Sequence, residues 1–264
     1  VIEDLGLRVA IVPQPNWQDD LRDFKKLGKP RLFFGVTSGN MDSMINHYTA
    51  RKRLRSTDAY TAGDKSGFRP DRATSVYTKI IRDNFPDSLI VAGGIEASLR
   101  RLTHYDYWDD KLMPSIMSDG NIDLLVYGMG EQTIRKICLQ LLKGDSIDKM
   151  TSLPQICYVA NSTPNNNTND KTKDAIILAD HEECLKSKRS FAKNFSIIEK
   201  ASNSIYAPKL AQKSGDRMIV VNPPELENND IDRYYEYPYT RLPHPKYWKK
   251  PLIPAFEMIR FSIN

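Results

Sequence analysis

The sequence has few cysteines, no long apolar run and little excess charge, and each shortage excludes a class of protein. Its 264 residues include three cysteines without a close pair, so a disulfide scaffold is excluded and a reducing compartment, the cytoplasm, is expected. No apolar run approaches the roughly 20 residues that span a bilayer, so we expect no membrane partner. Basic residues exceed acidic ones by 38 − 33 = 5, which is too few for a protein whose main task is coating nucleic acid or anionic lipid.

The positions of the cysteines also argue against a metal site. Cys138, Cys157 and Cys184 show no C-x-x-C or C-x-x-x-C spacing, and Cys138 falls on the apolar face of a predicted helix. We therefore assign all three to packing and expect no metal ligand. A hydrophobic fraction of 40% and a charged fraction of 27% are typical of an ordinary globular protein.

Short apolar runs alternate with amphipathic segments over the first 150 residues. The runs at 7–12, 31–37, 88–92 and 122–127 read as strands, and helical spacing occurs at 1–6, 19–27, 76–81 and 134–142. This alternation predicts an α/β fold with an open, mainly parallel sheet. Because a helix precedes the first predicted strand, we expect a further strand upstream.

The pattern changes near residue 150. An Asn/Thr-rich loop at 161–172 and a basic amphipathic helix at 182–202 precede a hairpin at 210–221, and seven of the sixteen prolines lie in 223–254. We therefore predict an α/β domain over 1–150, a smaller α+β segment over 151–222, and a Pro- and aromatic-rich connector over 223–264 that packs on another body.

Two glycine loops follow predicted strands and form the main candidate site. The first contains Gly93, Gly94 and Glu96. The second contains Gly128, Gly130 and Glu131. Loops at the carboxyl ends of parallel strands meet ligands, and glycine permits close backbone approach, so we expect a ligand or a second domain there. On this view Gly94→Val blocks docking with little effect on the fold.

The alternative is that the glycines only turn the chain and that Glu131 stabilises a helix N-terminus. Neither loop is a dinucleotide or P-loop motif, so a plain NAD enzyme or P-loop NTPase is not supported.

Two further groups of polar residues are substrate candidates. The first group is Asn40, Asp42, Asn46 and His47. It follows the strand at 31–37, and its alternative role is a capped helix that packs its apolar side chains. The second group is His104 and Asp106, as acid/base residues. The alternative for that region is that its aromatic residues pack on a neighbouring domain while Arg100 and Arg101 pair with Asp109 and Asp110.

A basic stretch covers residues 51–72, with seven basic residues against three acids. Such a stretch could contact the phosphates of RNA, although a basic loop is more often solvated.

Six distinctive segments follow one another along the whole chain: FGVTSGNMDSMIN at 34–46, RPDRA at 69–73, GGIEASLRR at 93–101, HYDYW at 104–108, VVNPP at 220–224 and PAFEMIRFS at 254–262. In this order they resemble the N-terminal region of the YgiQ (UPF0313) family of radical SAM proteins. The resemblance implies a cobalamin-binding-like α/β domain that precedes a radical SAM barrel in the same polypeptide.

The resemblance also implies a chemistry for the parent protein. Three cysteines in a C-x-x-x-C-x-x-C motif hold a [4Fe–4S] cluster, which binds S-adenosylmethionine and cleaves it reductively. That motif is absent here and would follow shortly after residue 262, so we expect this chain alone to be inactive and carry over no catalytic residue. No D-x-H-x-x-G occurs, which counts against cobalamin. The substrate stays unassigned. The alternative function is a free-standing α/β module that binds a nucleotide-like ligand or RNA.

Overall fold

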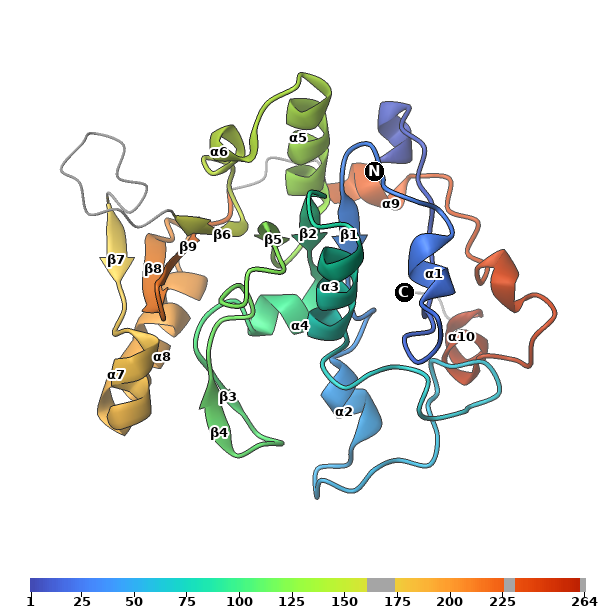
Figure 1. Ribbon diagram of the computed structural model, residues 1–264, viewed down its shortest axis with the longest axis horizontal. Coiled ribbons are helices and arrows are strands. Elements are labelled where there is room, and N and C mark those ends of the chain that lie inside the picture. The colour runs from blue at the N-terminus through green and yellow to red at the C-terminus, as the bar shows by residue number, and fades with distance from the viewer. Residues whose placement is uncertain (161–173, 226–230, 262–264) are drawn as a thin grey trace.

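The computed structural model describes residues 1–160, 174–225 and 231–261, and its centre is one seven-stranded sheet (Figure 1). In chain order the strands are β1 (Phe34–Val36), β2 (Ile90–Ala92), β5 (Leu124–Val126), β6 (Ile156–Ala160), β7 (Ala175–Ile177), β8 (Lys209–Ser214) and β9 (Arg217–Val221). Their order across the sheet is β1-β2-β5-β6-β9-β8-β7. The pairs β1–β2, β2–β5 and β7–β8 are parallel, and β6 pairs antiparallel with β5 and β9. The expected α/β class with an open sheet is confirmed.

Helices connect the strands and cover both faces of the sheet. They are α1 (Arg22–Lys25), α2 (Ser43–His47), α3 (Ala73–Asn84), α4 (Gly94–Leu99), α5 (Glu131–Leu142), α6 (Ile147–Met150), α7 (His181–Lys186) and α8 (Lys188–Ser202). Alternation along β5 sends Leu124 and Val126 into a cluster with Ile137 of α5, whereas Leu125 enters a cluster with Ala97 of α4. No helix of the described residues is long and apolar enough to cross a membrane.

The helix and the hairpin predicted after residue 150 are both present, together with β6 and β7, which the pattern did not predict. The helix expected over 182–202 is divided into α7 and α8 at Ser187, whose hydroxyl caps α8 by accepting from the Ser190 N–H at 3.1 Å. The predicted hairpin is β8–β9, and β9 pairs with β6, so the hairpin continues the same sheet. The loop expected at 161–172 lies outside the described residues. The division into three segments stays a prediction.

The expected strand over 7–12 is wrong. A short 3-10 helix, Glu3–Leu5, is closed by Gly6 with φ 73°, and the residues after it have no strand assignment. Ile11 is 67% exposed there. An apolar run becomes a strand only where a neighbouring strand supplies hydrogen-bond partners, and β1 is paired on one side by β2 and is otherwise the edge of the sheet.

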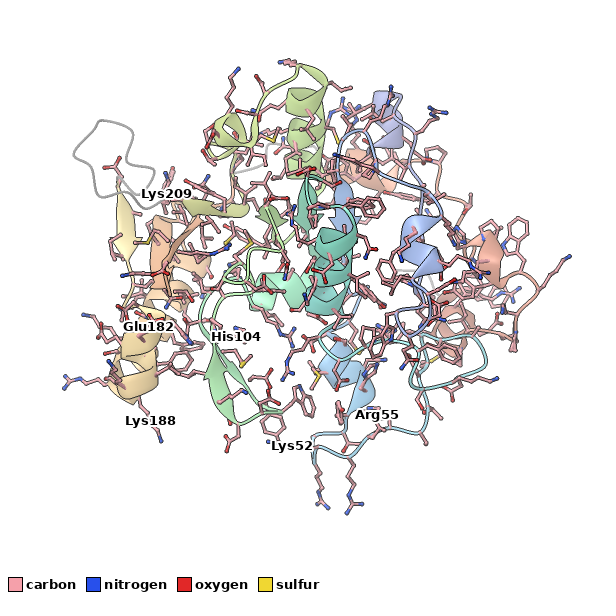
Figure 2. The ribbon with its side chains drawn as sticks, in the orientation of Figure 1. Lys52, Arg55, His104, Glu182, Lys188 and Lys209 are labelled. Carbon is pink, nitrogen blue, oxygen red and sulfur yellow. The ribbon has the colours of Figure 1, made fainter. Side chains whose placement is uncertain are left out.

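A second, two-stranded sheet stands apart from the large one. It consists of β3 (His104–Asp106) and β4 (Lys111–Met113), which follow α4 in the chain and pair antiparallel. Figure 2 shows His104 on this hairpin and Lys52 beside its tip. There the Lys52 Nζ lies 4.8 Å from the centre of the Tyr107 ring.

The C-terminal segment, 231–261, packs against the beginning of the chain. It contains α9 (Ile231–Tyr235), a 3-10 turn at Pro245–Tyr247 and α10 (Pro254–Ile259), and runs beside the N-terminal segment in Figure 1. The Lys246 Nζ donates to the Pro13 carbonyl at 2.9 Å, and the Gly63 N–H donates to the Leu252 carbonyl at 2.8 Å. These contacts place the connector over the α/β fold.

Candidate functional site

The parallel strands β1, β2 and β5 bring both glycine loops to one edge of the sheet. The loops begin directly after Val36, Ala92 and Val126, the last residues of these strands. The Gly93 N–H donates to the Val36 carbonyl at 2.9 Å, and the Gly128 N–H donates to the Ser98 hydroxyl at 3.3 Å. The structure therefore places the two loops side by side at the carboxyl edge, where open α/β sheets bind ligands.

Gly94 is the glycine at this edge that a side chain would disturb most. Its φ is 82°, and a Cβ there would collide with the Thr37 hydroxyl. This close approach ties the start of α4 to the loop after β1. The structure therefore corrects the expectation that Gly94→Val leaves the fold almost unaffected, since both the backbone angle and the contact require glycine.

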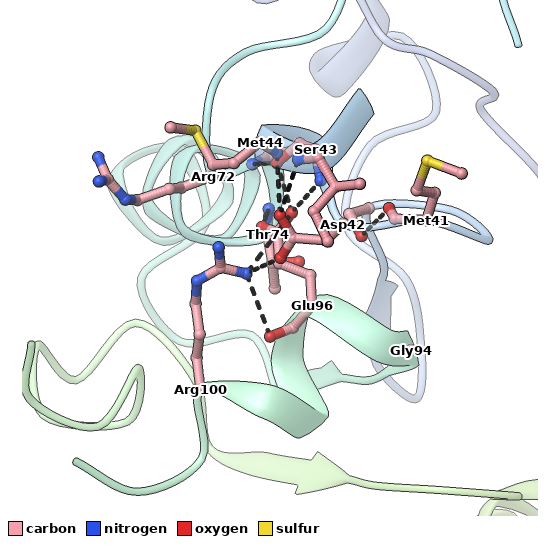
Figure 3. Close-up of polar contacts among 12 residues, drawn as sticks. Met41, Asp42, Ser43, Met44, Arg72, Thr74, Gly94, Glu96 and Arg100 are labelled. Carbon is pink, nitrogen blue, oxygen red and sulfur yellow. Dashed lines mark hydrogen bonds and ion pairs between the residues drawn. The ribbon is translucent and has the colours of Figure 1, made fainter. Parts of the chain in front are cut away.

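Glu96 lies beneath the loops rather than on the open edge. Its side chain is fully buried, and the carboxylate accepts from the Ser43 N–H at 3.0 Å, the Thr74 N–H at 2.8 Å and the Ser43 hydroxyl (Figure 3). Because Ser43 and Thr74 lie in the first turns of α2 and α3, one carboxylate satisfies free N–H groups of two helices. Its role in this structure is to join α4 to the first turns of α2 and α3.

Asp42 and Arg100 form a buried ion pair beside Glu96. Asp42 caps α2, accepting from the Met44 N–H at 2.9 Å, and its other oxygen pairs with the Arg100 guanidinium. The Arg100 guanidinium also lies 4.0 Å from the Glu96 carboxylate. A cation shared by two buried carboxylates offsets their mutual repulsion, so the cluster holds α2 against α4.

The other candidates after β1 lie at different depths. Asn40 is exposed on the loop, whereas Asn46 and His47 are buried on α2. The His47 Nδ1 contacts an Asp71 carboxylate oxygen at 2.7 Å, and the Tyr48 hydroxyl donates to the other oxygen at 2.8 Å. The structure thus brings Asn40 to the carboxyl edge and gives His47 a partner from the segment before α3.

The two candidates on β3 have separate environments. Burial lowers the pKa of His104, whose Nδ1 lies 3.1 Å from the Leu102 carbonyl. For Asp106, burial opposes ionisation, but the Asp109 N–H and the Arg72 guanidinium outweigh it and hold its pKa below the ordinary value. Arg72 donates to Asp106 at 2.9 Å. Asp106 is therefore ionised in an ion pair that joins α3 to the hairpin.

The expected pairing of Arg100 and Arg101 with Asp109 and Asp110 is wrong. Arg100 pairs with Asp42, and Arg101 lies over the Tyr127 ring at 4.7 Å. Asp109 pairs with Arg72 at 2.9 Å. Asp110 accepts from the Tyr105 hydroxyl. The residues are close in sequence, but the two arginines end α4 while the acids form the far turn of the hairpin, so each finds a partner from another element.

Side chains at the carboxyl edge are apolar and exposed. Ile95 and Leu99 of α4 are 48% and 59% exposed, and Met129 of the second glycine loop is 52% exposed. Ser98 lies between the two α4 residues in sequence and contacts the backbone of that second loop. Glu131, partly exposed, begins α5 at the same edge. Glycine backbone and exposed apolar groups together form a surface suited to contact with another body.

The basic stretch 51–72 is partly used within the chain. The Arg69 guanidinium lies 3.5 Å from the buried Asp58 carboxylate, and Arg72 pairs with Asp106. Lys52 donates to the Trp108 carbonyl at 3.2 Å. These internal contacts reduce the charge that the stretch can offer to nucleic-acid phosphates.

The cysteines of this chain do not fit an iron–sulfur cluster. Cys138, Cys157 and Cys184 are buried on α5, β6 and α7, and burial raises the pKa of each thiol, to about 12 for Cys157. Metal-binding cysteines are deprotonated and share one site. In the described part of the chain, no group of three or more His, Cys, Asp or Glu side chains could hold a metal ion.

Sequence reasoning missed Ser43, Thr74 and Arg100 as partners of the candidate carboxylates. Asp42 and Ser43 are residue types preferred at helix N-termini, so the sequence indicates that they cap a helix. Nothing local signals the contact of Ser43 with Glu96, because 53 residues separate them.

The fold is an α/β domain whose strand-end loops at this edge are held by buried polar contacts. The model of the protein family described as Radical SAM N-terminal matches residues 1–262. The chain belongs to this family. No solved structure matches the chain significantly.

Relatives support this assignment over the full chain. The chain is 53% identical over 268 residues to a UPF0313 protein of Porphyromonas gingivalis and 47% identical over 277 residues to one of Bacteroides thetaiotaomicron. It is 43% identical over 266 residues to a UPF0313 protein of Methanocella arvoryzae. All of this chain is covered in each case, but only 41%, 44% and 43% of those relatives. The chain thus spans less than half the length of the relatives that it matches.

Proposed function

We propose that this chain is the N-terminal accessory domain of a radical SAM enzyme, and that its carboxyl edge docks on the radical SAM barrel of the same polypeptide. The observation that carries the proposal is the exposed apolar group Ile95, Leu99 and Met129 beside the glycine loops. Apolar side chains gathered at one edge favour a contact that removes them from water. The greater length of the relatives supports a further domain as the occupant.

The chemistry of the parent then lies outside this chain. The family description supports a [4Fe–4S] cluster and S-adenosylmethionine as cofactors of the parent protein. The cysteines here do not fit the cluster, so this domain contributes position and enclosure: its loops cover the barrel and limit access of water to the radical step. The contacts of Glu96 with α2 and α3 hold these loops in place.

The test uses a chimera in which this chain replaces the matching region of the Porphyromonas gingivalis relative. Amide hydrogen exchange at residues 93–99 and 127–130 is compared between the chimera and the 264-residue chain. We expect slower exchange in the chimera, because the barrel covers this edge. Leu99→Asp in the chimera should restore fast exchange, since a carboxylate opposes burial in an apolar contact.

A matched control separates docking from general damage. Leu185 on α7 is 56% exposed and lies away from the edge, so Leu185→Asp should keep the slow exchange. Cluster absorbance after anaerobic reconstitution reports whether the barrel is folded in each chimera. If cluster content is normal and exchange at the edge equals that of the isolated chain, the proposed docking surface is wrong.

A further inference from the structure

A pocket outside the carboxyl edge lies between α2, the basic stretch and the start of α3. Its volume is about 360 Å³, which falls within the range of small-molecule sites, roughly 300–1,000 Å³. Trp17, Leu54, Pro70 and Val76 form apolar parts of its wall. Its polar lining includes His47, Arg55, Arg69 and Asp71. This pocket is separate from the proposed docking edge.

His47 is held in the pocket wall by an oriented hydrogen bond. Its side chain is 7% exposed, and its Nδ1 lies 2.7 Å from the Asp71 Oδ1. An ionised carboxylate only accepts, so we assign the ring proton to Nδ1. The Tyr48 hydroxyl donates to the second oxygen of Asp71 at 2.8 Å, which fixes the carboxylate. The His47 ring is thus oriented from one side, as are histidines that bind ligands through the other nitrogen.

Two buried nitrogen atoms of the lining have no protein partner. The His47 Nε2 and the Trp17 Nε1 are buried and make no hydrogen bond with any described residue. A buried polar atom without a partner is costly, so such atoms in the wall of a roomy pocket indicate a missing partner. The indole nitrogen only donates, whereas the Nε2 of a ring that carries its proton on Nδ1 accepts.

The cations of the lining differ in how far they are neutralised. Arg69 lies 3.5 Å from the Asp58 carboxylate and donates to the Ser38 carbonyl at 3.3 Å. Arg55 is exposed, and its Nε donates to the Tyr48 carbonyl at 3.2 Å (Figure 2). No carboxylate of the described residues lies within ion-pair distance of it. The backbone N–H of Arg55 donates to the His47 carbonyl at 2.7 Å, which fixes the backbone of Arg55 beside the end of α2.

We propose that this pocket binds a small organic oxyanion, a carboxylate or phosphate carried on an apolar group. Arg55 and the Trp17 indole supply donors for the oxygens, and the apolar wall accepts the remainder of the ligand. The donor-rich lining and the unpaired cation favour a negative charge, because guanidinium groups match carboxylate and phosphate geometry.

The test is NMR titration of the 264-residue chain with benzoate and with phenyl phosphate. The chain has three tryptophans, so its indole N–H region holds three signals, and Trp17→Phe identifies that of Trp17. We expect a saturable shift of the Trp17 signal with both anions. Neutral benzyl alcohol, of similar size, should cause none. The signals of Trp108 and Trp248, which do not line the pocket, serve as internal references.

Matched charge variants decide whether the pocket causes the shift. Arg55→Gln should weaken binding of both anions about tenfold, the usual effect of losing one charge-assisted hydrogen bond. Arg53→Gln makes the same change of charge two residues away, outside the lining, and should leave the affinity unchanged. Absence of a saturable shift in the folded chain, or equal weakening by the two variants, would overturn the proposal.

Discussion

The layer beneath the carboxyl edge of β1, β2 and β5 and the layer around the antiparallel strands β6, β9 and β8 are both buried, but they are held by different forces. Beneath the edge the buried groups are charged: Asp42, Glu96 and Arg100. In the antiparallel part they are mainly apolar, with Ile219 and Val220 fully buried. The first region depends on directed contacts and the second on the area removed from water.

This difference matters for what each region can do. Apolar burial is non-directional and tolerates small shifts, so it stabilises the sheet without fixing any one loop. Hydrogen bonds to Glu96 need specific geometry, and buried charges must be paired. The edge therefore has well-defined loops at the cost of desolvating charged groups, which suits a surface that meets another body.

The largest expected effect is at the centre of the polar cluster. Glu96→Gln removes the charge that faces Arg100 and turns an amide N–H₂ toward two donors, so we expect the free energy of unfolding to fall by about 3 kcal/mol. Glu131→Gln, at the partly exposed start of α5, should cost less than about 1 kcal/mol. Urea denaturation measures both. Equal losses would show that the edge is not held by its buried polar contacts.

A second effect uses pH to separate the directed contacts from the apolar ones. The pKa of Asp106 in the folded chain is below its ordinary value of 3.8, so its ion pair with Arg72 adds stability above that value. This contribution is lost as the pH falls through the lower, folded-state pKa. At pH 7, Asp106→Asn should cost about 2 kcal/mol, and the difference from the parent should shrink below pH 3.8.

The control for the pH series comes from the antiparallel strands. Ile219→Val removes one buried methylene group and should cost about 1 kcal/mol at every pH at which the chain is folded. Urea midpoints for both variants at several acidic pH values provide the comparison. A pH-independent penalty for Asp106→Asn would contradict a role for its charge.

The smallest effect concerns a single backbone contact. Gly94 and Gly144 have similar positive φ values, 82° and 79°, but a Cβ meets the Thr37 hydroxyl only at Gly94 and nothing within 4 Å at Gly144. Gly94→Ala should therefore cost about 1 kcal/mol more than Gly144→Ala. Adding Thr37→Ala to Gly94→Ala should recover that excess in a double-mutant cycle followed by thermal unfolding. Additive losses would mean that the loops do not touch as described.

Elements whose pattern is local could be predicted from the sequence. Helix α5 follows from apolar residues at helical spacing, and the β8–β9 hairpin follows from two short runs around Gly215. The placement of both glycine loops at one edge follows from the alternation of strands and helices. Residues 7–12 have the same apolar composition as a strand, and their exposure shows that composition does not decide pairing.

The roles of the candidate residues were harder to predict from the sequence. Glu96 reads from the sequence as an acid in a glycine loop, yet it is fully buried and joins two other helices. His47 was a candidate for contact with substrate, but its partner in the structure is Asp71, which lies 24 residues further along the chain. A titratable residue in a loop can face solvent or the interior, and only the neighbouring elements decide which.

By itself the sequence determined the α/β class, the longer helices α3, α5 and α8, the strands β1, β2, β5, β8 and β9, and membership of a family recognisable from its long sequence segments. These features depend on periodicity and on the order of residues along the chain, which are read locally. The tertiary structure alone decided which charges pair. Arg100 meets Asp42 across 58 residues and Arg72 meets Asp106 across 34, because helices and strands of fixed length carry these side chains to a common place. Such pairs leave no periodic signal, so the support beneath the edge and the pocket at His47 emerge only when the chain is folded.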